Sequence, residues 1–137
     1  MCFSAAIKKL EIHLAELASS RYQVKFCVEG TAEEYVLIDG LIDGLDSDLV
    51  FFRWSPRPER WVSLEQRIGD KALSHILAIE STYKSSPDFL DKYSFETLRE
   101  LVDEDPIWAT IREQARCALD AMGFDIDKWE REILPGK

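Results

Sequence analysis

Apolar side chains recur at helical spacing close to the N-terminus. They lie three, four, three and one residues apart, which places them on one helical face: Ile7, Leu10, Leu14, Leu17 and Ala18. The hydroxyl of Ser4 stands before them and can cap the first turn. The pattern predicts an amphipathic helix that begins near Ser4 and ends near Ala18.

The pattern changes at Tyr22, where apolar and polar side chains alternate as far as Glu29. Alternation with a period of two is typical of a half-buried strand. The short runs Tyr35–Ile38 and Leu49–Trp54 are rich in β-branched and aromatic residues and predict two more strands. Between them lies a short tandem repeat, in which Leu41–Gly44 has the same sequence as Leu37–Gly40. Its two Asp-Gly steps favour the end of a hairpin with a bulge.

The second half of the chain favours helices. Pro56 and Pro58 end the strand region because neither can donate to a ladder. Apolar positions from Ile68 to Tyr83 then recur every three or four residues and predict one long helix, weakened by Gly69 near its start.

Three further helices are predicted after a loop at residues 84–88. Ser94 can cap a short helix that extends to Val102. Asp105 and Pro106 have the residue types of a helix start, and Gly123 can end that helix after Met122. A last short helix is expected to run to Leu134, capped by Asp125 or Asp127.

These elements predict an α+β protein of one domain spanning residues 1–137. A small antiparallel sheet of about three strands is expected to pack against an N-terminal helix and several C-terminal helices. At 137 residues and 15.8 kDa, such a domain buries enough surface to fold without a metal or a disulfide.

The charge balance narrows the possible partners. The chain has 17 basic and 26 acidic residues, and its net charge of −9 disfavours direct contact with nucleic acid or anionic lipid. No apolar run approaches the length that spans a bilayer, and the N-terminus lacks the pattern of a signal peptide. Cys2, Cys27 and Cys117 form an odd set without a C-x-x-C pair, which favours a cytoplasmic protein without disulfides or a zinc site.

Acidic residues are concentrated between Glu29 and Asp48, a stretch called the acidic segment below. It contains no Lys or Arg and seven carboxylates: Glu29, Glu33, Glu34, Asp39, Asp43, Asp46 and Asp48. Such a segment can steer a basic protein surface, and its carboxylates can stand where phosphates would bind a nuclease or another nucleic-acid-binding protein. A solvated face is the simpler alternative. A calcium loop is disfavoured, because the Asp spacings of four, three and two do not match an EF-hand.

Trp and Arg are concentrated just after the acidic segment. The stretch Phe51–Trp61 contains the side chains that most often anchor protein interfaces, here Trp54, Arg57, Arg60 and Trp61. The alternative is that the aromatic residues belong to the core and that the arginines pair internally with the acidic segment. The sequence leaves both interpretations open.

Enzyme chemistry has little local support. No nucleophile elbow, phosphate loop or zinc-protease motif is present, so neither catalytic residues nor a cofactor is predicted. A small hydrolase or transferase remains the alternative, with a site built on Cys27, His13 or His75 that only the fold brings together. A sensor with an apolar pocket between helix and sheet is a third possibility.

The sequence therefore favours a non-enzymatic protein-binding module. Its expected role is that of an acidic inhibitor or immunity-type protein that blocks a basic site on a partner, either a nuclease or another nucleic-acid-binding protein. The acidic segment is expected to steer association, and the Trp and Arg side chains are expected to hold the complex. The sequence leaves the oligomeric state open.

Overall fold

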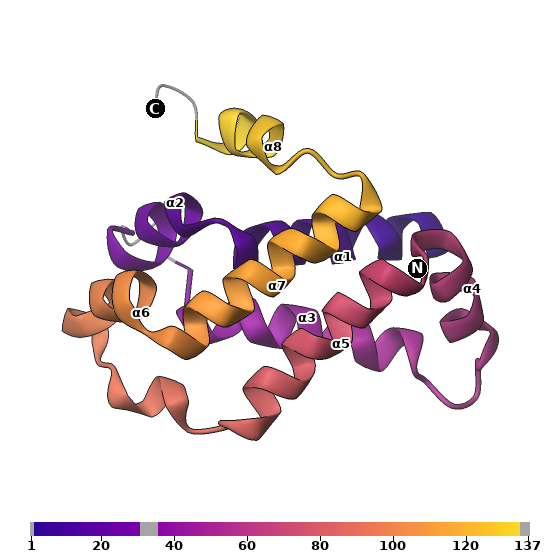
Figure 1. Cartoon of the computed structure of the whole chain (residues 1–137), viewed down its shortest axis with the longest axis horizontal. Helices are drawn as coiled ribbons and strands as arrows, with labels where there is room; N and C mark the ends of the chain where they lie inside the picture. The colour runs from indigo at the N-terminus through magenta and orange to yellow at the C-terminus, as the bar shows by residue number, and fades with distance from the viewer. Residues whose placement is uncertain (1, 31–35, 135–137) are drawn as a thin grey trace.

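The computed structural model describes residues 2–30 and 36–134, and all regular structure in these ranges is helical (Figure 1). The predicted α+β fold with an antiparallel sheet is therefore wrong, because the described residues contain no strand. The elements are α1 (Phe3–Ala18), α2 (Ser20–Gln23), the π-helical turn η1 (Val24–Val28), α3 (Ile38–Phe52), α4 (Glu59–Ile68), α5 (Asp70–Ser85), the 3₁₀ turns η2 (Phe89–Lys92) and η3 (Phe95–Thr97), α6 (Leu98–Glu104), α7 (Pro106–Met122) and α8 (Ile126–Ile133).

Helix α7 is the centre of the arrangement and packs against both α1 and α5 (Figure 1). Helix α3 lies against α1, and α4 contacts α3 and α5. Helix α6 packs on α7, and α8 contacts α2. The side chains between these helices form one apolar cluster, whose largest fully buried members include Trp108, Phe52, Leu10, Leu14, Ile76, Ile79 and Ile111.

The predicted strand at Tyr22–Glu29 is helical instead. Residues four apart make the contacts of a helix: the rings of Tyr22 and Phe26 lie 4.9 Å apart, and Gln23 and Cys27 are both buried. The amide of Glu29 donates to the carbonyl of Val24 at 2.8 Å, which closes the π-helical turn. A run of eight residues can fit both the strand period of two and the helical period of 3.6. A helix forms its backbone hydrogen bonds within itself and needs no partner strand.

The other predicted strands and the hairpin end lie in or next to α3. The predicted strand Leu49–Trp54 covers the last turn of α3 and the residues that follow it. The tandem repeat that begins at Leu37 covers the start of α3. The predicted strand Tyr35–Ile38 lies partly outside the described residues, and Ile38 begins the helix. A repeat of four residues is close to the helical repeat, so it continues into α3, where Leu41 and Leu45 lie on one buried face, whereas Leu37 precedes the helix and is exposed.

Gly69 divides the long helix that was predicted from Ile68 to Tyr83. Its backbone has φ +88°, a conformation that favours glycine, so α4 ends at Ile68 and α5 begins at Asp70. The sequence pattern also missed α4 itself, which follows Pro58 directly.

The predicted helix starts and ends are otherwise largely confirmed. Asp105 caps α7 and accepts hydrogen bonds from the amides of Ile107 and Trp108, both at 2.9 Å. Gly123 ends α7 with φ +76°, and Asp125 rather than Asp127 caps α8. At the N-terminus the prediction was two residues off, because Cys2 rather than Ser4 holds the cap position of α1. None of the helices in the described ranges is long and apolar enough to cross a membrane.

Two glycines of α3 have different surroundings, which gives a matched test of the packing between α1 and α3. Among the residues that the structure describes, a methyl group at Gly40 would meet the Cβ of Leu37 alone, at 3.9 Å, whereas one at Gly44 would lie 3.0 Å from the His13 ring. We expect Gly40→Ala to raise the free energy of unfolding by about 0.5 to 1 kcal/mol through helix propensity. Gly44→Ala is expected to lose that gain, because the His13 ring must move. Urea denaturation measures both variants, and an equal gain in the two would contradict this packing.

Candidate functional site

Helix α3 places part of the acidic segment on one outward side. Asp39 and Asp43 are exposed, and Asp46 is half-buried. Their spacings of four and three residues correspond to about one helical turn each, so the three carboxylates follow one side of the helix. Asp39 also lies in the first turn, where the helix dipole favours a negative charge. Glu33 and Glu34, which were predicted to share this role, lie outside the described residues.

The outward carboxylates are largely free of internal partners. Asp39 and Asp43 make no hydrogen bond or ion pair with any residue in 2–30 or 36–134, and Asp46 accepts one hydrogen bond, from the Tyr83 hydroxyl at 2.9 Å. Of the acidic segment, Glu29 pairs with an arginine, Arg99 of α6, at 2.8 Å. No described ion pair joins the Arg and Trp stretch to the acidic segment, but Arg53 lies near enough to Asp46 for that carboxylate to contribute to the raised pKa of Arg53, after the larger effect of Glu80. The alternative of internal pairing is therefore supported only for Arg53 and Asp46.

Asp48 faces the opposite way and belongs to the packing of α3 on α1. It is 6% exposed, and its Oδ2 lies 2.6 Å from Nδ1 of His13. The hydrogen bond to Asp48 raises the pKa of His13 above its usual value, against an opposing effect of burial. Because Asp48 is turned inward, we leave it out of the outward surface.

This pair gives a pH-dependent prediction for His13→Gln. Because the folded pKa of His13 is raised, its contribution to stability is fully present below about pH 6.5, the unfolded value, and is lost as the pH rises through the folded value. The stability difference between wild type and variant should therefore shrink with increasing pH. Urea denaturation of both proteins between about pH 5.5 and pH 9 measures it. A constant difference across that range would contradict the role of the His13 charge.

The Trp and Arg stretch forms the corner between α3 and α4, and its members differ in accessibility. Trp54 is 50% exposed, and the Arg60 guanidinium stacks between its ring and that of Phe51, 5.2 Å and 4.0 Å from the two centroids. Arg57 is exposed and pairs locally with Glu59. Trp61 is half-buried and packs against the core, so it contributes little outward surface.

Two arginines of this corner form ion pairs with glutamates outside the acidic segment, Arg53 with Glu80 and Arg57 with Glu59. Arg53 forms two hydrogen bonds of 2.6 Å with Glu80 of α5, and its guanidinium lies 5.1 Å from the Trp61 ring centroid. This bidentate pair raises the pKa of Arg53 and lowers that of Glu80. It fixes α3 to α5 and leaves Trp54 as the outermost ring of the corner.

The outward side of α3 changes from acidic to apolar along its length. Val50 is 63% exposed and follows Asp46 by four residues, and Trp54 follows Val50 by four. The sequence analysis missed Val50 because it placed this residue in a strand. The signal was present in the spacing, since positions 39, 43, 46 and 50 are separated by four, three and four, and Trp54 lies two residues beyond the end of α3. We call this set of five side chains the α3 stripe.

A groove of about 470 Å³ runs beside the acidic half of the α3 stripe. One wall is α3, and the other is the end of α5 with the segment that follows it, Pro87–Asp91. Ile42 and Leu90, both half-buried, contribute to an apolar floor, and Asp91 adds a fourth carboxylate. We call it the α3 groove.

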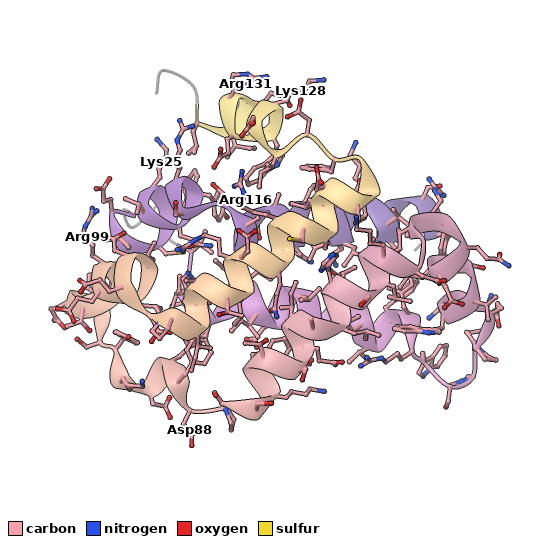
Figure 2. All side chains as sticks on the ribbon, in the orientation of Figure 1. Lys25, Asp88, Arg99, Arg116, Lys128 and Arg131 are labelled. Atoms are coloured by element: carbon pink, nitrogen blue, oxygen red, sulfur yellow. The ribbon has the colours of Figure 1, made fainter. Side chains whose placement is uncertain are left out.

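Several basic side chains lie away from this region, although Lys84 lines the α3 groove and Lys92 follows Asp91. Figure 2 shows Lys128 and Arg131 on α8 at the top of the view, with Lys25 and Arg99 towards the end formed by η1 and α6. Asp88, at the lower edge of the same view, belongs to the Pro87–Asp91 segment. The negative charge of the α3 groove is therefore reinforced, rather than cancelled, by this neighbouring residue.

The groups proposed for enzyme chemistry are less suitable. Cys27 is fully buried, and burial raises the pKa of its thiol to about 12, which keeps the nucleophilic thiolate scarce. The Nδ1 atom of His13 is occupied by Asp48, and His75 is half-buried in α5. Among the described residues, no three His, Cys, Asp or Glu side chains are placed to hold a metal ion.

Comparison with known proteins adds neither a family nor a structural relative to this picture. The chain matches no protein-family model, no curated protein and no solved structure.

Proposed function

We propose that this chain is a non-enzymatic protein-binding module that blocks a basic functional site on another protein, as an inhibitor or immunity-type protein does. The observation that carries the proposal is the α3 stripe. It joins two open carboxylates of α3, Asp39 and Asp43, to two exposed apolar side chains, Val50 in the last turn of α3 and Trp54 two residues beyond its end. Charged groups beside a desolvated aromatic anchor are the usual composition of a binding surface.

The two halves of the stripe have different roles in this proposal. The carboxylates speed the encounter with a basic surface, since opposite charges attract over the Debye length of about 8 Å at physiological salt. Val50 and Trp54 slow dissociation, because their apolar area leaves water only in the complex. Arg57 and Arg60 lie beside Trp54 and supply polar contacts at the rim.

A nucleic-acid-binding site is the class of partner site that suits these charges best. Asp39 and Asp43 are four residues apart, which corresponds to a rise of about 6 Å along the helix. Carboxylates repeated at this interval present a row of negative charge, as the phosphates of a nucleic-acid strand do to a basic groove.

The hydrolase or transferase alternative is supported less well, because the buried Cys27 thiol and the occupied His13 offer no accessible nucleophile or free base. The compartment in the proposal is the cytoplasm. It is supported by three cysteines that form no disulfide, at positions 2, 27 and 117.

Photo-crosslinking in the producing cell tests the proposal. A benzophenone side chain at position 50, in the middle of the α3 stripe, should crosslink one protein with a basic surface. The same group at Ser74, an exposed residue of α5, serves as the position control. The crosslink should disappear in Asp39→Lys/Asp43→Lys and persist in Asp103→Lys/Asp120→Lys, which makes the same charge change at two other exposed sites.

Two results would overturn the proposal. One is the absence of a specific crosslink at position 50 while the variant is folded, as shown by circular dichroism. The other is a crosslink that both pairs of reversals remove equally, which would reduce the effect of the α3 stripe to net charge.

A further inference from the structure

The α3 groove combines an apolar floor with an acidic rim. Ile42 and Leu90 contribute to the floor, and Phe89 lies beneath them with only 5% of its surface exposed. The rim carries the carboxylates of Asp39, Asp43, Asp46 and Asp91. A ligand that matches this arrangement has an apolar stem and a positively charged end, which is the composition of a lysine or arginine side chain.

The groove neutralises its own rim only in part. Lys84 lines it, and its ammonium lies 3.1 Å from Glu80. Glu80 also binds Arg53 through both oxygens, so its one negative charge faces two cations near Asp46. Tyr83 donates to one oxygen of Asp46, which holds that carboxylate in place without adding a charge. The remaining negative charge is available to a cation from outside.

The spacing of the carboxylates favours an organic cation over a metal ion. A hard metal ion needs several oxygens that converge within about 2.6 Å of one point. The described residues contain no such group, and the three α3 carboxylates are instead spread over two helical turns. A guanidinium or ammonium on a flexible stem can contact them one after another.

The groove continues into a second depression of about 500 Å³, so it can hold a segment of chain rather than a single side chain. The two share Asp39, Leu90 and Asp91. The second depression adds Leu37, which is 61% exposed, and Tyr93. Apolar neighbours of the basic residue therefore have a surface to pack on.

We propose that the α3 groove receives a lysine or arginine side chain carried on a protruding segment of the basic protein partner. The stem of that side chain lies on Ile42 and Leu90, and its charged end lies between Asp43 and Asp91. This inference rests on the proposed function and names the contact that the partner makes beside the α3 stripe.

Chemical-shift mapping on the full ¹⁵N-labelled chain tests the groove directly. The probe is a five-residue peptide, blocked at both ends, with arginine between two leucines, and the control peptide carries neutral citrulline in place of arginine. The arginine peptide should shift amide signals of residues 39–46 and 83–91 in a saturable manner. Asp39→Asn/Asp43→Asn should raise its dissociation constant about fivefold, from the loss of two ion pairs.

The matched variant Asp103→Asn/Asp120→Asn removes the same charge at exposed sites outside the α3 groove and should leave the dissociation constant unchanged. Equal shifts from the citrulline peptide, or shifts centred elsewhere on the surface, would overturn the inference. If the crosslink at position 50 still forms in that case, the proposed function stands and only the groove contact fails. If instead the groove binds the arginine peptide but no crosslink forms at position 50, the proposed function fails and the groove contact does not.

Discussion

Replacing Asp39 and Asp43 together by lysine is expected to slow association with the basic partner about tenfold or more at low salt. The two exposed carboxylates have no described internal partner, so their charge acts on the approaching surface, and its reversal turns attraction into repulsion. Asp46 is left unchanged because it accepts the Tyr83 hydroxyl. Surface plasmon resonance with the crosslinked partner, over a range of salt concentrations, measures the association rate.

The opposite kinetic change is expected for Trp54→Ala. Trp54 is half-exposed in the free protein, and its loss removes apolar contact area from the complex without changing the charge. A loss of about 2 kcal/mol, usual for an anchor residue, raises the dissociation rate about thirtyfold and leaves the association rate nearly unchanged. Val62→Ala, at a position 52% exposed on α4, is the matched control.

For the first prediction, an association rate that neither salt nor the reversal of Asp39 and Asp43 alters would rule out electrostatic steering.

Gln23→Ala is expected to lower the free energy of unfolding by about 3 kcal/mol, the largest effect on stability that we predict. Gln23 is fully buried, and its Nε2 donates to the carbonyls of Glu16 and Leu17, each at 2.9 Å. Its Oε1 accepts the indole N–H of Trp108, also at 2.9 Å. Removal of the side chain leaves these buried polar groups unpaired and opens a cavity between α2 and α7.

Two further variants separate the causes. Gln23→Met keeps most of the volume and removes the hydrogen bonds, so it should show the greater part of the loss. Gln66→Ala, on the exposed side of α4, should change the free energy of unfolding by less than about 0.5 kcal/mol. Urea denaturation measures all three, and a loss confined to Gln23→Ala would assign the effect to the cavity instead of the hydrogen bonds.

Under the proposed function, the placement of charge would make the binding of this acidic protein selective. A uniform negative surface attracts every basic molecule to a similar degree, whereas the α3 stripe joins its carboxylates to the apolar side chains of Val50 and Trp54 at and just beyond the end of α3. A partner must then match both halves, which adds a requirement for shape to the requirement for charge. The α3 groove adds a third requirement, a basic side chain at a particular position.

The sequence determined those features that depend on residues close together in the chain. The start of α7 followed from Asp105 and Pro106, and its end followed from Gly123, because caps act through neighbouring backbone groups. The apolar face of α1 followed from its spacing in the same way. The acidic segment and the concentration of Trp and Arg after it were also visible from residue types alone, whereas the exposure of Trp54 was not.

Tertiary structure decided whether the short apolar runs became strands or helices. Leu49–Trp54 and Tyr22–Glu29 are compatible with either, and the choice depends on whether a pairing strand or a helical partner is available. The same is true of the acidic residues. Asp43 faces outward and Asp48 lies against His13, although both belong to one segment and one helix, because a helix turns positions five apart towards different neighbours. The amino-acid composition does not distinguish the two carboxylates. The packing of α3 on α1 decides that Asp43 is exposed and that Asp48 is buried.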